Sequence, residues 1–131
     1  MVARLRLAGL RPTRQRVALA ELLFGHGDRH VTAESLREEA LAAGHSMALA
    51  TIYNTLHQFK RAGLLRELAV DGTKSYFDTN LTDHSHFLHE EDGSLSDIEG
   101  GAIEVGKLPT PPDGTEISHV DVIVRVRGKA S

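Results

Sequence analysis

The chain has 131 residues, 40% apolar and 25% charged, a composition typical of a folded globular protein. It contains no cysteine, which excludes disulfides, thiolate zinc sites and thiol catalysis. No run of about 18 apolar residues is present, so a membrane span is excluded, and without a signal-peptide pattern a cytoplasmic location is expected.

Charge is divided unevenly along the chain. The net charge is −3, but residues 1–79 carry +3 and residues 80–131 carry −6. The first 20 residues hold five arginines and no acidic residue. We expect contacts with nucleic-acid phosphates to be confined to the front part, although a solvated basic face is the alternative interpretation.

Three amphipathic helices are predicted in the front part. Apolar residues recur at helical spacing over residues 14–24, 33–43 and 48–62. Thr32 is a suitable N-cap for the second helix, and glycines at 25, 44 and 63 end the three segments.

A β-hairpin follows the helices. Residues 64–70 and 73–78 read as strands joined at Asp71-Gly72, a strong two-residue turn signal. Three helices and a hairpin predict a winged helix-turn-helix, whose third helix enters a major groove. Many three-helix domains do not bind DNA, so this alternative stays open at this stage.

The rear part is predicted to be a small pairing domain. A polar linker covers residues 80–83, and strands are expected at 86–89, 94–98 and 117–126, with one short helix within 100–108. This part has few large apolar residues and can bury little surface by itself. A second copy of the chain is therefore expected to cover its exposed face. The prediction is an α+β chain with a winged-helix domain at 1–79 and a small α/β dimerisation domain at 84–131.

The densest group of metal-ligand residue types follows the linker. On a strand, residues two apart share a face, so His84 and His86 can point at one ion. Asp78 precedes this segment, Asp97 lies on the next predicted strand, and His30 lies in a predicted loop before the second helix.

Together these residues offer five nitrogen and oxygen ligands from different elements. Such a set suits Fe²⁺ or Mn²⁺ better than a closed thiolate zinc site. The alternative is that His-x-His on a surface strand is only polar surface.

Six segments, taken in this order, carry a resemblance that covers nearly the whole chain. They are Gly9–Arg16, His30–Glu34, Leu49–Leu56, Gly63–Leu65, Tyr76–Asp78 and Asp83–His86. The chain resembles the ferric uptake regulator (Fur) family, and within it the peroxide-sensing PerR and iron response regulator Irr branches.

The resemblance implies a metal-responsive repressor of iron homeostasis or the peroxide response, in which a homodimer binds an inverted-repeat operator in double-stranded DNA. It implies a regulatory metal site between the two domains, with Zn²⁺ as a substitute for iron or manganese in vitro. The implied ligands are His30, Asp78, His84, His86 and Asp97. The two aspartates are similar to those of the PerR branch.

The resemblance also implies DNA contacts. Arg11 corresponds to a minor-groove residue and Tyr53 to a base-contacting residue of the third helix, although a partly buried core aromatic is the alternative for Tyr53. Thr51 and Asn54 lie near Tyr53, and Arg14 and Arg16 belong to the basic N-terminal segment. We include all four among the predicted DNA-binding residues.

Departures from the family pattern are concentrated in the rear part. Most members hold a structural zinc with two Cys-x-x-Cys pairs; here His89 and Asp92 replace the first pair and the second has no counterpart, so a four-cysteine zinc is not expected. Ser85 interrupts the three histidines that the Irr branch ties to haem. His89 and His119 are considered as additional ligands.

The residues leave three rival functions open. An Irr-type regulator would bind DNA without metal and be released by haem. A non-haem iron enzyme would use histidines and a carboxylate, but five protein ligands leave little room for substrate, so no enzymatic activity is expected. A winged-helix protein without metal is the third.

Overall fold

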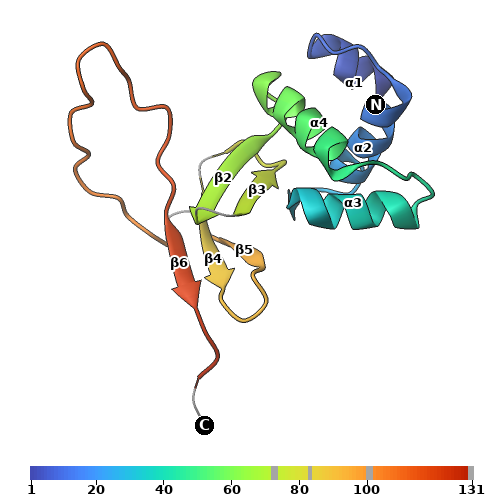
Figure 1. The fold of residues 1–131 in the computed structure, drawn as a ribbon. Helices are drawn as coiled ribbons and strands as arrows, with labels where there is room; N and C mark the ends of the chain where they lie inside the picture. The colour runs from blue at the N-terminus through green and yellow to red at the C-terminus, as the bar shows by residue number, and fades with distance from the viewer. Residues whose placement is uncertain (72–73, 83, 100–101, 130–131) are drawn as a thin grey trace. The chain divides into compact units, whose positions relative to one another are not determined.

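A computed structural model describes residues 1–71, 74–82, 84–99 and 102–129 (Figure 1). The chain divides into two compact units, Met1–Leu81 and Thr82–Ser131. The first contains four helices and a small sheet, and the second contains a separate three-stranded sheet. This arrangement confirms the α+β class.

The three helices expected in the first unit are confirmed. They are α2 (Arg14–Phe24), α3 (Ala33–Ala42) and α4 (Leu49–Arg61). The side-chain oxygen of Thr32 accepts a hydrogen bond from the backbone of Ser35, whose hydroxyl accepts one from Thr32 in return. This reciprocal capping fixes the start of α3 immediately after β1.

A fourth helix, α1 (Val2–Leu7), was not anticipated from the sequence. It has no side-chain cap and buries one residue, Leu5, so it carries too little periodicity to be recognised. Leu5 is fully buried, and the guanidinium carbon of Arg4 lies 4.2 Å from the ring centre of Phe24. Contacts with the domain core therefore hold this short helix.

The sheet of the first unit has the order β1-β3-β2, with antiparallel neighbours. The strands β2 (Arg66–Asp71) and β3 (Lys74–Asp78) form the wing; the predicted Asp71-Gly72 turn extends outside the described residues. The expectation that His30 lies in a loop was wrong, because His30–Val31 forms β1 against the end of β3. A two-residue strand has no periodicity of its own and exists only through its partner.

The core of the first unit joins all these elements. Its largest fully buried side chains come from α1, α2, α3, α4 and β3: they are Leu5, Leu19, Leu23, Leu36, Ile52, Leu56, Phe59 and Phe77. Phe77 points into this core from the same strand that carries Asp78. A metal-ligand candidate thus sits on a strand fixed by core packing.

The second unit is built around β4 (Ser85–His89), which lies between β5 (Leu95–Ile98) and β6 (Ile123–Val126). The β4–β5 pair is antiparallel, whereas β4 and β6 run parallel. Residues His86 to Leu88 of β4 are therefore paired with a residue of each neighbour, and Figure 1 shows β4 between the arrows of β5 and β6.

Two expectations for this unit were wrong. The described residues within 100–108 form no helix, since glycines at 100, 101 and 106 and the proline at 109 disfavour one. The strand expected at 117–126 is reduced to Ile123–Val126, because β4 offers only His86 to His89 for pairing. Val122, Val124 and Val126 are only partly buried and Val120 is exposed, so alternation of apolar residues did not show how much of the segment finds a partner strand.

Candidate metal centre and nucleic-acid interface

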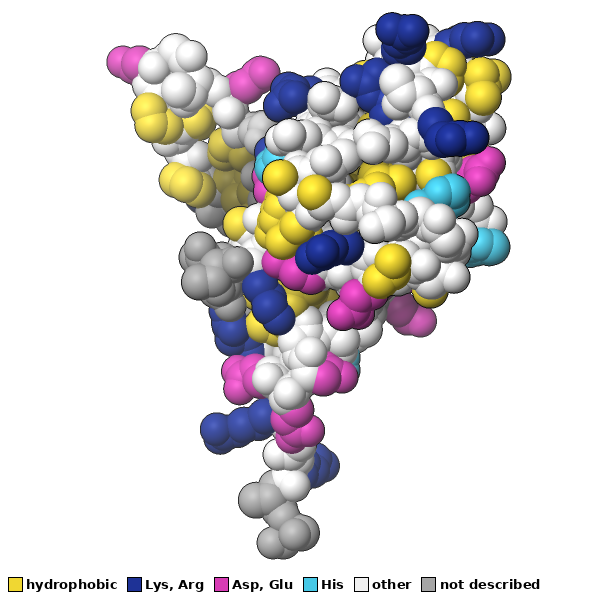
Figure 2. All heavy atoms as spheres, turned by 45° about the vertical axis from the view of Figure 1, so that its right-hand side comes forward, with side chains coloured by type: hydrophobic (Ala, Val, Ile, Leu, Met, Phe, Trp, Pro, Cys, Tyr) yellow, Lys and Arg dark blue, Asp and Glu magenta, His cyan; other side chains and the backbone are white. Residues whose placement is uncertain are grey.

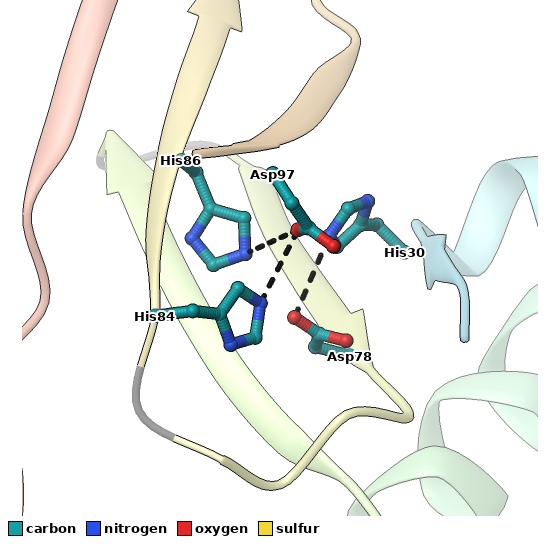
Figure 3. A group of neighbouring side chains, drawn as sticks. All are labelled: His30, Asp78, His84, His86 and Asp97. Atoms are coloured by element: carbon teal, nitrogen blue, oxygen red, sulfur yellow. Dashed lines mark ion pairs between the residues drawn. The ribbon is translucent and has the colours of Figure 1, made fainter. Parts of the chain in front are cut away.

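The first pair of candidate ligands lies where β1 meets the end of β3. Antiparallel register aligns His30 with Asp78, and Nε2 of His30 lies 3.5 Å from Oδ2 of Asp78. The other carboxylate oxygen accepts a hydrogen bond of 2.8 Å from the backbone of Asn80. We call His30 and Asp78 the front cluster; Figure 3 shows the imidazole and carboxylate facing each other.

The second group, called the rear cluster, consists of His84, His86 and Asp97. The β4–β5 register places His86 opposite Asp97, and His84 precedes β4 by one residue. The Nε2 atoms of His84 and His86 lie 3.2 and 3.5 Å from the same oxygen of Asp97. These three residues offer ligand atoms within 4.8 Å of one another, and Figure 3 shows both imidazoles directed at the carboxylate.

The tautomer of His84 is set by its own backbone segment. Its Nδ1 lies 2.7 Å from the carbonyl oxygen of Thr82, which only accepts hydrogen bonds, so Nδ1 carries the proton. In a neutral imidazole of this tautomer, the lone pair lies on Nε2, the atom that faces Asp97. Metal-binding histidines are commonly oriented by such a bond from the second ring nitrogen.

Each cluster combines imidazole with carboxylate, the donor types that suit Fe²⁺, Mn²⁺ and Zn²⁺. Both arise from strand register, which keeps ligand side chains at fixed positions without cysteine. Two histidines held toward one carboxylate oxygen constitute a ready arrangement for a divalent cation.

The two additional ligand candidates are engaged elsewhere. Nε2 of His89 lies 2.9 Å from the hydroxyl of Ser96, and Nε2 of His119 lies 3.4 Å from Asp121. Neither belongs to the group of candidate metal ligands among the described residues. The carboxylate of Asp92 caps the β4–β5 turn, because it accepts hydrogen bonds from the hydroxyl and the backbone N–H of Ser94. These bonds lower the pKa of Asp92.

A basic groove lies on the first unit, between the start of α2 and α4. Its volume is about 390 Å³, and its lining contains two arginines, amides and hydroxyls but no carboxylate: Arg11, Thr13, Gln15, Arg16, Thr51, Asn54, Thr55 and Gln58. Figure 2 shows Lys and Arg side chains gathered at the upper, helical end of this unit. The groove has the charge and donors that a phosphate requires.

Arg16 is held within this groove. Its Nε and Nη2 atoms donate to the side-chain oxygen of Gln58 at 3.3 and 3.0 Å, and Nη1 donates to the carbonyl of Arg11 at 2.9 Å. Gln58 was not predicted from the sequence, although it lies four residues after Asn54 and therefore on the same helical face.

Four of the six predicted DNA-binding residues line the groove, and Arg14 and Tyr53 do not. Arg14 is exposed, whereas Tyr53 is half-buried against the core, with its hydroxyl 3.5 Å from Glu34. Burial raises the pKa of Tyr53 above 10.0, and the charge of Glu34 raises it further. The phenol therefore stays protonated at neutral pH and can donate a hydrogen bond.

Helices α2 to α4 and their wing, together with two histidine–carboxylate clusters, define a winged-helix protein equipped with metal ligands. A family model described as "Ferric uptake regulator family" matches residues 7–125. The chain belongs to the ferric uptake regulator family, as the resemblance indicated, and is a metal-responsive transcriptional regulator of that family.

Relatives and solved structures agree with this assignment. The chain is 34% identical to the peroxide operon regulator of Bacillus subtilis, over 88% of this chain and 79% of that protein. It is 35% identical to the peroxide-responsive repressor PerR of Staphylococcus aureus, over 90% and 80% of the two chains.

Two solved structures share the fold. The ferric uptake regulator of Pseudomonas aeruginosa with manganese has a TM-score of 0.71 at 29% identity, covering 98% of this chain and 97% of that one. The Vibrio cholerae regulator has a TM-score of 0.75 at 21% identity, covering 97% and 98%. Among the described residues, no helix is long and apolar enough to span a bilayer.

Proposed function

We propose that the protein is a homodimeric repressor that binds an inverted-repeat operator and that a divalent metal ion sets its affinity for DNA. The observation that carries this proposal is the strand register, which aligns His86 with Asp97 and His30 with Asp78. In each pair, a nitrogen and a carboxylate oxygen face each other as ligands of one cation would.

We infer further that the front and rear clusters serve the same ion. The front cluster offers two donors and the rear cluster three, whereas Fe²⁺ and Mn²⁺ commonly take five or six ligands. Only five residues separate Asp78 from His84, so their backbones are never more than about 20 Å apart. The family resemblance supports the same five-ligand set.

Iron or manganese is the proposed physiological ion, because five nitrogen and oxygen donors exceed the four ligands that a structural zinc usually takes. The Pseudomonas aeruginosa relative was solved with manganese, which supports Mn²⁺ as a working probe. The relatives named for peroxide support a peroxide signal, and a regulatory rather than enzymatic role.

The DNA side of the proposal rests on the basic groove and on α4. Arg11 and Arg16 supply charge beside hydroxyl and amide donors, so a backbone phosphate is the expected occupant of the groove. With this anchor, the exposed parts of α4 would read bases in a major groove.

Dimerisation through the second unit is supported by its exposed apolar side chains. Val105, Leu108, Ile117 and Val120 expose between 39% and 51% of their surface. A second copy of the unit would remove this area from water.

Metal would act by favouring one arrangement of the two units. An ion that binds the DNA-competent arrangement more tightly shifts the equilibrium by the ratio of its two affinities. The arrangement in turn sets the spacing of the two α4 helices of the dimer, and hence their fit to the operator half-sites.

The test uses full-length protein stripped with a chelator and an operator selected from random duplex DNA. Affinity is measured by fluorescence anisotropy with and without Mn²⁺. We expect at least about a tenfold change, corresponding to a coupling of about 1.4 kcal/mol. His84→Ala should lose the dependence on Mn²⁺, whereas the exposed His26→Ala control should keep it.

Equal affinity with and without Mn²⁺, and with Fe²⁺ under anaerobic conditions, would contradict the sensor proposal. DNA binding that survives this result would leave a winged-helix repressor without metal control.

A further inference from the structure

Arg29, the residue before His30, is fastened to the sheet by its backbone. Its N–H donates to the hydroxyl oxygen of Thr79 at 2.8 Å, and the N–H of Thr79 donates to the carbonyl of Arg29 at 3.0 Å. Thr79 follows Asp78, so these bonds extend the β1–β3 register by one pair. The two bonds between Arg29 and Thr79 therefore fix the backbone next to His30 and keep His30 opposite Asp78.

The side chain of Arg29 reaches two helices. Nη1 donates to the carbonyl of Leu22 at 2.7 Å, and Nη2 contacts a carboxylate oxygen of Glu39 at 2.7 Å. Leu22 belongs to the last turn of α2, where carbonyls lack an intrahelical donor and a cation is favoured. Glu39 belongs to α3, so one guanidinium joins α2, α3 and β1.

We propose that Arg29 is a positioning residue of the metal centre: it holds His30 opposite Asp78 and connects this ligand pair to α2 and α3. This inference rests on the proposed function, since it requires His30 and Asp78 to bind the regulatory ion. Arg29 would also connect the ion to the DNA-binding surface. It contacts the last turn of α2, and the first turn of the same helix lines the basic groove.

The chemistry of the side chain is specific to arginine. Its planar group presents donors in two directions, one toward the carbonyl of Leu22 and one toward Glu39, while the backbone stays in the sheet. A lysine ammonium is a compact charge with no such fixed fork. Arg29→Lys should therefore keep the charge but hold His30 less well.

Three variants of the full-length protein separate positioning from general stability. Arg29→Ala and Arg29→Lys change the residue itself. Lys60→Ala removes an ion pair of equal length, Lys60 to Glu67 at 2.7 Å, that is not joined to β1. Calorimetric titration gives the Mn²⁺ dissociation constant, and the melting temperature is measured on metal-free protein.

We expect Mn²⁺ binding to weaken about tenfold in Arg29→Ala, as for removal of other residues that orient metal ligands, and to weaken less in Arg29→Lys. Lys60→Ala should keep the wild-type constant. Titrations run below the melting temperature of every variant, so a loss of stability alone leaves the constant unchanged. If Arg29→Ala does not fold, Arg29→Lys carries the test.

The outcomes distinguish the two proposals. A wild-type Mn²⁺ constant in Arg29→Ala, or in Arg29→Lys if only that variant folds, overturns the positioning role, provided that His30→Ala weakens binding. A wild-type constant in His30→Ala overturns the assignment of His30 as a ligand, and the role of Arg29 falls with it. Equal weakening in Arg29→Ala and Lys60→Ala would also overturn the inference, because the effect would not depend on contact with β1.

Discussion

The imidazole of His57 meets the ring of Phe77 edge to face, with ring centres 5.6 Å apart and planes at 82°. Phe77 is fully buried and directly precedes the candidate ligand Asp78 on β3. His57 also stacks on Tyr53 one turn earlier on α4, at 6.3 Å and 18°. A continuous set of rings therefore connects the proposed base-contacting residue to the strand that carries a ligand.

Replacing His57 by alanine should remove both ring contacts. Aromatic pairs contribute about 0.5–1.5 kcal/mol each, so the free energy of unfolding should fall by about 1–3 kcal/mol. Urea denaturation of metal-free protein measures this change. His26→Ala, at an exposed position, should change it little; equal losses in the two variants would show that the ring contacts contribute nothing.

Replacing Arg16 by glutamine should alter the salt dependence of DNA binding. A phosphate held by Arg16 displaces a counterion, so the slope of log affinity against log salt should become shallower by about 1. Anisotropy titrations at several salt concentrations give this slope. Arg37→Gln, on α3 outside the groove, should retain the wild-type slope; an unchanged slope for Arg16→Gln would exclude a phosphate at this guanidinium.

Adding Mn²⁺ should raise the melting temperature of the wild-type protein. A ligand at about 100 times its dissociation constant stabilises the folded state by about 2.7 kcal/mol. His86→Ala should lose most of this rise, while His119→Ala should keep it, because His119 pairs with Asp121 outside both clusters. A full rise in His86→Ala would remove that residue from the ligand set.

Acid should weaken the contribution of Glu67 to stability. Burial alone would raise its pKa, but hydrogen bonds from Lys60 and Ser75 outweigh burial and leave the pKa below 4.5. Because the folded pKa is depressed, this contribution is fully present above the unfolded pKa and is lost as the pH falls through the folded value.

The comparison of wild type with Glu67→Gln isolates this effect. The difference in unfolding free energy should be constant above the unfolded pKa of Glu67 and should shrink as the pH falls through its depressed folded pKa. The exposed Glu38→Gln serves as a control for general acid effects. A difference that does not change with pH would contradict the assignment to the carboxylate charge.

Long periodic segments were predictable from the sequence, whereas elements that depend on a partner were not. The helices α2 and α4 follow from the spacing of apolar residues, and the rear cluster follows from strand alternation. In contrast, β1 exists only through its register with β3, and α1 through contacts of Leu5 and Arg4.

The same limit applies to the sites. Residue types and spacing indicated His84 and His86, because both lie on one short segment. Arg29 and Gln58 act through bonds to residues 50 and 42 positions away, respectively, and only the folded chain displays these bonds. Ile117–Val122 shows the opposite error, since its alternation is real but β4 is too short to pair with it.

Parallel pairing of β4 and β6 has a consequence for the chain that connects them. Parallel neighbours require a long crossover. Here the crossover contains β5, and its remaining stretch from Glu99 to Val122 has no helix or strand among its described residues. The entropy cost of closing a loop grows only slowly with its length, so a longer or shorter stretch costs the pairing of the ligand-bearing strands little. The same stretch carries Val105, Leu108, Ile117 and Val120, the exposed apolar side chains proposed for the dimer. A change in its length would therefore alter subunit association while the metal donors on β4 and β5 keep their places.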